Sequence, residues 1–279
     1  AFFNGNAGGG IPRFEVLPYV DLLYNKALFR DRSLYFRSFY GDELFTQYYH
    51  DKYGVSDEEP THRLALSDPA DLGKIRLSWN IGVADLPVDV LRQRVAVALS
   101  RALRPGIARL FYHADFWKGS PPADAPKDLP VHARLGRPPR RSVNYQRELI
   151  LDKVNGLPEF LVGRVPQKQY NAEILRSRII LSPFGWGELC KRDFEAVYNR
   201  SLLLKPDMSH LETWPDVFVP GETYVPFDWD ASDLVDKARA ALADESGRRR
   251  ITERAWQSYH DQLAGLDRRF EQVLEAVLG

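Results

Sequence analysis

Short apolar runs and segments of helical period alternate along the second half of the chain. The apolar runs predict strands at 130–135, 159–162, 179–182, 201–205 and 223–227. Apolar residues at helical spacing predict helices at 141–155, 169–176, 192–198, 232–243 and 251–274. Strands and helices that alternate at this spacing form a parallel sheet covered on both faces, so we expect an α/β fold.

The first half of the chain has a less regular pattern. Residues 14–60 are dense in aromatic and charged side chains, which we interpret as broken helices. The elements expected in this half are helices at 19–30 and 41–53, a helix start at 68–74, a strand at 74–80 and an amphipathic helix at 87–103.

A proline-rich stretch separates the two patterns. Residues 119–130 carry four prolines and few apolar side chains, which is typical of a linker. We therefore expect a first domain at 1–118 and a second at 131–279. Because the chain begins at Ala1 and not at a methionine, we expect elements before it to be missing and the first domain to be irregular or truncated.

Composition narrows the class of protein. Lys plus Arg and Asp plus Glu both number 38, so a uniform basic field for nucleic acid is not indicated. Cys190 is the only cysteine, which excludes a disulfide within the chain and a cysteine-based zinc cage. The sequence has neither a long apolar window nor a signal-peptide pattern, so we expect a cytoplasmic protein without a membrane span.

The segment after the apolar run 179–182 has the composition of a phosphate-binding turn. Gly185 and Gly187 allow close backbone approach, and the helix that follows offers free N–H groups to an anion. Lys191 and Arg192 add positive charge at that point. The same pattern also occurs in turns that only connect a strand to a helix, so both interpretations stay open at this point.

An ordered series of features from Arg134 to Leu274 resembles the donor-binding domain of GT-B-fold glycosyltransferases, of the group 1 or exostosin-like type. The series comprises Arg134 before a basic loop, Gly163-Arg164-Val165-Pro166, Ile180-Leu181-Ser182-Pro183-Phe184-Gly185, Phe194-Glu195-Ala196-Val197-Tyr198, Leu202–Lys205, Tyr224-Val225-Pro226 and Asp233-Leu234. The resemblance implies two Rossmann-like domains. It also implies transfer of a sugar from a nucleotide-sugar donor to an acceptor hydroxyl, in glycan or surface polysaccharide synthesis.

The family marks its donor site with two glutamates separated by seven residues. Glu188 and Glu195 have six residues between them, and Gly187 stands where the first glutamate is usual. By resemblance, Glu195 holds the ribose, while Arg134 and Arg192 face the diphosphate and make the reaction independent of a metal or cofactor. The donor-binding residues implied are Arg134, Gly185, Trp186, Gly187, Lys191, Glu195, Lys205, His210, Glu212 and Thr213.

Four side chains are candidates for catalysis. Glu188 and Arg192 lie in the glycine-rich segment. His113 and Asp115 follow the apolar run 107–111, where either could act as the general base for an acceptor hydroxyl or lie on a surface loop. The acceptor would be a free, lipid-linked or protein-linked glycan.

Two further motifs have a simpler interpretation. Asp228-Trp229-Asp230 looks like a metal motif of another glycosyltransferase fold, but Asp230 or Ser232 more simply caps the helix that follows. Arg248-Arg249-Arg250 is interpreted as a solvated helix start, with peripheral contact to anionic lipid as the alternative.

Two other functions remain open from the sequence. The chain could be a non-catalytic nucleotide- or glycan-binding remnant of the same fold. It could also be an unrelated doubly wound enzyme that acts on a phosphate-bearing substrate, such as a sugar-phosphate epimerase. Binding and turnover of nucleotide sugars distinguish these alternatives.

Overall fold

The computed structural model describes the chain except residues 6–7, 81, 83–89, 105–106 and 108–120. Its largest sheet has five parallel strands in the order β12-β10-β9-β7-β8. These strands are β7 (Leu129–His132), β8 (Phe160–Leu161), β9 (Ser177–Leu181), β10 (Leu202–Pro206) and β12 (Val225–Phe227). The apolar runs of the second half thus form one parallel sheet, and the α/β class is confirmed there.

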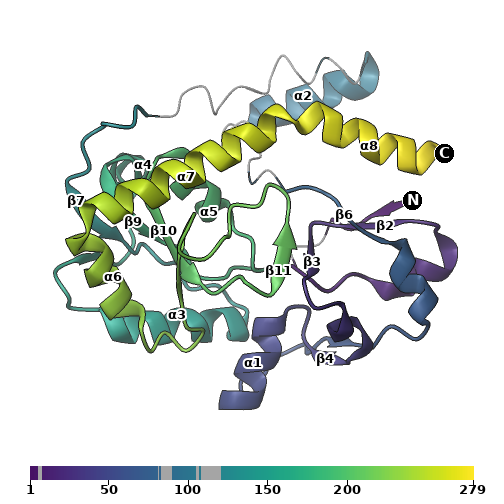
Figure 1. The fold of residues 1–279 in the computed structure, drawn as a ribbon, viewed down its shortest axis with the longest axis horizontal. Coiled ribbons are helices and arrows are strands. Elements are labelled where there is room, and N and C mark those ends of the chain that lie inside the picture. The colour runs from purple at the N-terminus through teal and green to yellow at the C-terminus, as the bar shows by residue number, and fades with distance from the viewer. Residues whose placement is uncertain (6–7, 81, 83–89, 105–106, 108–120) are drawn as a thin grey trace.

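Helices cover both faces of this sheet (Figure 1). They are α3 (Arg141–Val154), α4 (Gln167–Arg176), α5 (Lys191–Tyr198), α6 (Leu234–Ala243) and α7 (Glu245–Ala264). Along β9, Ile179 and Leu181 join the core that contains α3 and α6, whereas Ile180 joins the core that contains α5 and α7. Successive side chains of a strand point to opposite faces, so a strand buried on both faces reads as one apolar run.

The observed bounds in this half lie within three residues of the predicted ones, with two exceptions. The helix predicted at 251–274 is two helices, α7 and α8 (Leu266–Leu278), which meet at Gly265. The polar segment after β10, where no strand was predicted, contains the strand β11 (Leu211–Thr213). None of the described helices has the length and apolar character that a bilayer crossing requires.

The first half contains a small parallel sheet in the order β1-β2-β6. Its strands are β1 (Phe2–Phe3), β2 (Leu23–Asn25) and β6 (Ile75–Leu77); the other strands of this half are β3 (Ala27–Phe29), β4 (Phe39–Tyr40) and β5 (His62–Arg63). The α-helices are α1 (Leu44–Tyr53) and α2 (Val90–Ala102), with 3₁₀ turns at Phe14–Tyr19, Arg32–Phe36 and Pro69–Lys74. The helices predicted at 41–53 and 87–103 are confirmed within the described residues.

The helix predicted at 19–30 is wrong, because this segment forms β2 and β3. Every residue of both strands is buried, which leaves no polar face for a surface helix. The Asn25 side chain is buried between them and donates to the carbonyls of Gly9 at 2.8 Å and Ala27 at 2.7 Å. These bonds hold the chain where it passes from one strand to the next.

The two halves are joined by shared structure. β3 pairs antiparallel with β11, so a strand from each half forms a two-stranded ribbon. One hydrophobic core contains Phe45 of α1 together with Phe184 and Phe194 of the second half. A separation into domains at 118 and 131 and a two-domain GT-B arrangement stay predictions.

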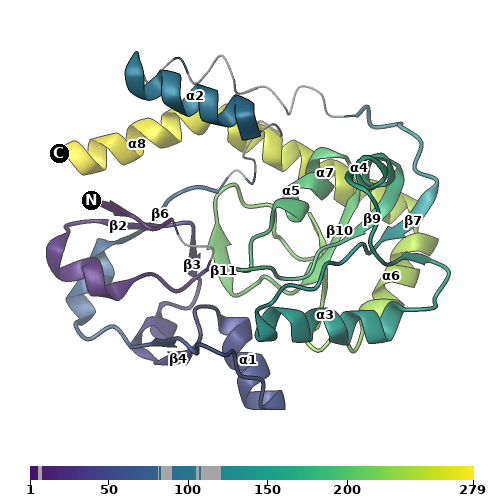
Figure 2. The same ribbon diagram turned by 180° about the vertical axis from the view of Figure 1, so that it is seen from behind.

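The final helix returns toward the first half. α7 runs along the five-stranded sheet, and α8 continues over the β1-β2-β6 sheet (Figures 1 and 2). Phe270 of α8 contacts Trp79 edge-on, with ring centroids 5.9 Å apart. Arg269 donates to the carbonyl of Leu77 at the end of β6.

Candidate functional site

The strand order places a topological switch point between β7 and β9. β8 lies on one side of β7, whereas β9, β10 and β12 follow on the other side. In open α/β sheets, ligands bind at such a point, beyond the carboxyl ends of the two strands. The segments there are 133–140 after β7 and 182–190 after β9, and the second is the glycine-rich segment singled out by the sequence.

Three arginines converge on this point. Arg192 donates to the carbonyl of Arg134 at 2.9 Å and to that of Leu181 at 3.5 Å. Arg147 of α3 donates to the carbonyl of Gly136 at 2.6 Å, and its Nε is buried without a hydrogen-bond partner. Burial, and then the nearby Arg192 charge, lower the pKa of Arg147. Neither Arg147 nor Arg192 forms an ion pair with a carboxylate in the described part of the chain, so this point carries uncompensated positive charge.

His132, the last residue of β7, supports the same conclusion. Its ring is fully buried against Tyr170, and neither ring nitrogen has a hydrogen-bond partner. Burial lowers the pKa of His132 to about 4, and the charges of Arg192 and Arg134 lower it as well, while the Glu173 carboxylate, 3.7 Å from Nε2, opposes the shift. The imidazole is therefore neutral at pH 7, and an anion bound beside it would raise its pKa.

Glu195 and Lys191 lie beside the arginines on the first turns of α5. The Glu195 carboxylate accepts a hydrogen bond from the Tyr170 hydroxyl at 3.0 Å and lies 3.6 Å from the Lys191 ammonium. The Arg192 guanidinium lies over the Tyr170 ring, 5.7 Å from its centroid. Arg134 already has a carboxylate partner, because its Nε and Nη2 both donate to Glu173 at 2.8 Å.

Glu188 lies between the two halves of the molecule. It is fully buried, and neither carboxylate oxygen has a hydrogen-bond partner. A Cβ added at Gly9 would lie 2.1 Å from Glu188 Oε2, so this loop of the first half passes directly over the carboxylate. His210, whose ring nitrogens also lack partners, lies 3.9 Å from Glu188 Oε1. Buried polar groups are normally hydrogen-bonded, so an orphaned pair of this kind is a feature of sites that receive a ligand.

A second buried carboxylate, Glu43, stands at the start of α1 near Glu188. Arg140 donates to both of its oxygens, at 3.0 and 2.7 Å, and Thr46 donates at 2.8 Å. Burial raises the pKa of Glu43 to about 7; the Arg140 contact opposes this shift, and the Glu188 charge adds to it. Arg140 also bonds Asp57 at 3.0 Å, which ties the second half to the loop after α1.

An open pocket of about 610 Å³ adjoins this cluster. Its lining includes Gly8 and Glu43 of the first half and Trp186 of the glycine-rich segment, whose indole is 56% exposed. The acidic residues that line it are Asp42, Glu43, Asp57, Glu58 and Glu59, and the basic ones are Arg13, Arg140 and Arg141. An exposed aromatic face beside several carboxylates suits a saccharide, because ring faces stack and hydroxyls donate hydrogen bonds.

Three of the predicted donor-binding residues are held by other partners. Lys205 is fully buried, and its ammonium lies 3.0 Å from the equally buried Asp193. Glu212 pairs with Arg32 at 2.6 Å, and Thr213, buried in β11, donates to the carbonyl of Pro215. In the described structure these contacts join the halves or stabilise the sheet edge, and they leave no free Lys205 ammonium at the site.

The other features predicted from the sequence lie partly at the site and partly outside the described residues. Gly185 and Gly187 form the turn, with Gly185 N–H donating to Gly187 O at 2.9 Å. His113 and Asp115 lie outside the described residues. Asp230 pairs with Lys52 and accepts from the Ser232 N–H in the turn before α6. The helix cap predicted at Asp230 or Ser232 is wrong, because the N-cap of α6 is Asp233. The described residues contain no group of three or more potential metal ligands, and metal independence stays a prediction.

Sequence reasoning missed Gly9, Glu43 and Arg147. A signal existed for Gly9, because a glycine-rich stretch follows β1 as the later glycines follow β9. The sequence offered no comparable signal for Glu43 or Arg147, since their partners lie elsewhere in the chain.

Comparison with known families gives the class of the second half. Residues 141–275 match a family described as glycosyl transferase-like. This part of the chain is similar to a glycosyl transferase-like domain, and the match supports a glycosyltransferase of the group 1-like type. No curated protein and no solved structure gives a significant match.

Proposed function

We propose that the protein transfers a sugar from a nucleotide-sugar donor to an acceptor hydroxyl in glycan or surface polysaccharide synthesis. The observation that carries this proposal is the uncompensated charge of Arg147 and Arg192 at the switch point of a glycosyl transferase-like domain. A nucleoside diphosphate would neutralise this charge. Without such an anion, two partly buried guanidinium groups near each other are unfavourable.

In this proposal the donor diphosphate lies against Arg192 and Arg147, and Glu195 accepts hydrogen bonds from the ribose. The arginines stabilise negative charge that develops on the leaving diphosphate as the glycosidic bond breaks. This would make the reaction independent of a metal. The sugar would then project toward Glu188 and His210, whose unpartnered polar atoms can bond its hydroxyl groups.

The open pocket beside Trp186 is the proposed acceptor site. Glu43 lines this pocket and lies close enough to Glu188 for the two charges to interact. With a pKa of about 7, Glu43 can exchange a proton near neutral pH, as a general base requires. The proposed acceptor is a saccharide, free or linked to lipid or protein.

The test measures binding and turnover of a panel of nucleotide sugars by the native chain, with candidate saccharides as acceptors. We expect Arg192→Gln to weaken donor binding about tenfold, because a charge-assisted contact is lost. Arg254→Gln is the matched control, since Arg254 lies on a different helix, α7, and pairs there with Glu222. Absence of donor binding by the native chain would refute the proposal, and binding without turnover would favour the non-catalytic alternative.

A further inference from the structure

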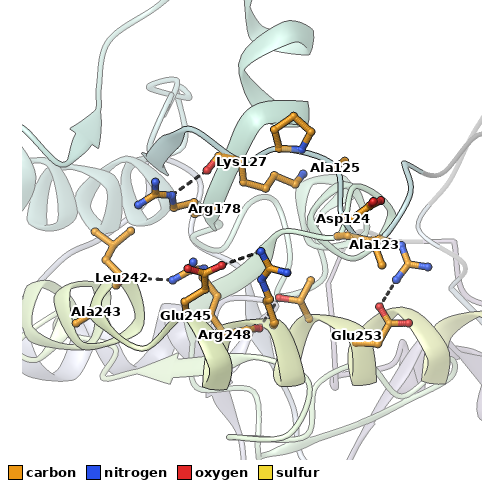
Figure 3. A pocket seen from close by; sticks show the side chains of 14 residues that line it. Ala123, Asp124, Ala125, Lys127, Arg178, Leu242, Ala243, Glu245, Arg248 and Glu253 are labelled. Atoms are coloured by element: carbon orange, nitrogen blue, oxygen red, sulfur yellow. Dashed lines mark hydrogen bonds and ion pairs between the residues drawn. The ribbon is translucent and has the colours of Figure 1, made fainter.

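A second cavity, of about 530 Å³, lies at the opposite edge of the five-stranded sheet. Segment 123–127, before β7, forms one wall, and the first turns of α7 form the other (Figure 3). Arg178 at the start of β9 and Arg200 before β10 complete it. The cavity is therefore separated from the candidate site by the length of the strands.

Positive charge is in excess in this cavity. Five basic side chains line it, namely Lys127, Arg178, Arg200, Arg248 and Arg249, against the three acidic ones, Asp124, Glu245 and Glu253. Two acids are already paired, because Glu245 contacts Arg249 at 2.7 Å and Glu253 contacts Arg200. Lys127, Arg178 and Arg248 form no ion pair within the described part of the chain.

These three cations are held in place by neutral oxygens only. Lys127 Nζ donates to the carbonyls of Leu175 and Asn199, both at 2.6 Å, and to the Ser201 hydroxyl at 3.2 Å. Arg178 Nε donates to the carbonyl of Lys127 at 2.9 Å, a bond drawn in Figure 3. Arg248 Nη1 donates at 2.9 Å to a carbonyl at the end of α6. Carbonyl groups orient these cations without neutralising them, so their charge remains available to a ligand.

Two of these cations have a lowered pKa. Burial lowers the pKa of Lys127 to about 8. Burial, followed by the charge of Arg178, lowers the pKa of Arg248. Both shifts arise first from burial of the charged forms, and for Arg248 the nearby Glu245 and Asp244 charges oppose the shift. A bound anion would raise both pKa values.

We propose that this cavity binds a phosphate-bearing ligand, a mono- or diphosphate group that accepts hydrogen bonds from Arg178 and Arg248, with the Lys127 ammonium adding positive charge beside it. The cavity has the volume of a small-molecule site. The phosphate is either that of a soluble metabolite or the headgroup of an anionic lipid, because both present the same oxygens. The proposal is independent of the proposed donor site, which lies at the other edge of the sheet.

The experiment titrates inorganic pyrophosphate by calorimetry into the Arg192→Gln variant, a background in which binding at the proposed donor site is expected to be about tenfold weaker. In that background we expect Arg178→Gln/Arg248→Gln to weaken binding at least about tenfold. The control Arg254→Gln should change it less than about twofold. Equal affinity of the double variant, or an equal loss in the control, overturns the proposal.

A second measurement uses the native chain and so does not depend on the folding of a variant. Lys127, with its low pKa, should react readily with an amine-acylating reagent, and saturating pyrophosphate should slow its modification several-fold. Lys237, paired with Asp233 on α6, is the internal reference and should be unaffected. Unchanged reactivity of Lys127 with pyrophosphate contradicts the proposal.

Vesicles identify the source of the phosphate. Binding to phosphatidylcholine vesicles with about 20% phosphatidic acid, lost in Arg178→Gln/Arg248→Gln, assigns a lipid headgroup. Pyrophosphate binding without vesicle binding assigns a soluble ligand. Binding to neither overturns the proposal.

Discussion

Two buried acid–base pairs lie near the same edge of the five-stranded sheet and differ in how they are satisfied. Lys205 and Asp193 are 3.0 Å apart, and Asp193 also accepts from the Ser182 hydroxyl at 2.6 Å and the Cys190 N–H at 2.8 Å. Glu188 and His210 are 3.9 Å apart, with no hydrogen bond to either side chain.

This difference distinguishes a buried pair that stabilises the fold from a buried pair that is available to a ligand. A buried charge is tolerated when partners in the fold replace its lost hydration, as they do for Asp193 and Lys205. That pair fixes the start of α5 to β10, and Asp193 is the better satisfied member, since the 3.0 Å contact with Asp193 is the only polar contact that the described structure shows for the Lys205 ammonium. Glu188 has no such partners, so the fold bears a cost that a bound sugar or nucleotide would remove. The comparison predicts that the first pair controls stability and the second controls activity.

The largest expected effect is on stability, from Lys205→Met. This substitution leaves the Asp193 carboxylate buried without its counter-charge, which costs about 3–5 kcal/mol in the free energy of unfolding. Urea denaturation measures it. Lys237→Met is the control, because that lysine pairs with Asp233 at the surface and should contribute under about 1 kcal/mol. Equal effects of the two substitutions would remove the distinction between the pairs.

His132 provides an intermediate case, a buried polar group that avoids the cost by staying neutral. Its pKa of about 4 in the folded state lies below the ordinary value of about 6.5, so the unfolded chain binds the proton more readily between these values. The contribution of neutral His132 to the free energy of unfolding is fully present above about pH 6.5. It falls by about 3 kcal/mol as the pH drops to 4.

Denaturation at a series of pH values tests this prediction. His132→Phe should flatten the dependence between pH 4 and 6.5. The exposed His62 serves as the control, and His62→Phe should leave the dependence unchanged. A saturating nucleoside diphosphate should shift the titration of His132 to higher pH, observable by NMR, if the anion binds beside Arg192 as proposed.

Glu188→Gln should lower the rate of sugar transfer about 100-fold or more, since it removes the charge from a polar group at the proposed sugar position. The free energy of unfolding should stay the same or rise, because an unpaired buried charge is lost. Turnover and urea denaturation of the same preparation measure both quantities. A large loss of stability with unchanged turnover would show that Glu188, like Asp193, serves the fold.

The same contrast explains how much the sequence could predict. The apolar run Ile179–Leu181 predicts β9 because the strand is buried on both faces, which is a local property. β11 was missed because a three-residue polar strand gains its stability from β3, a distant segment. The helix predicted at 19–30 was wrong for a related reason, since burial by the rest of the molecule decided its structure.

The residues of the candidate site also differ in whether local sequence or distant contacts determine their positions. Arg192, Glu195 and the glycine turn could be proposed from the sequence because their neighbours in sequence are also their neighbours in space. The neutralisation of Lys205 by Asp193 needed a contact between two elements, and sequence spacing does not show which lysine is buried. The position of Gly9 over Glu188 depends on how the two halves meet, which no local pattern determines.

The smallest expected effect comes from Gly9→Ala, which tests whether the loop after β1 positions Glu188. The new Cβ would meet only the end of the Glu188 side chain, so the carboxylate would swing aside with little loss of stability. We expect transfer to slow about tenfold, equivalent to about 1.4 kcal/mol in the barrier. Gly5→Ala is the matched control, because a Cβ at Gly5 has no heavy atom within 4 Å.

The informative comparison is the double variant, since Gly9→Ala acts through Glu188 only if the two changes are not additive. In the Glu188→Gln background, Gly9→Ala should slow transfer by less than about twofold, because the displaced carboxylate is already absent. A full tenfold loss in that background would mean that the loop contacts the substrate itself. The unpartnered carboxylate would then be a consequence of how the halves pack, and the contrast with Asp193 would no longer identify the site of catalysis.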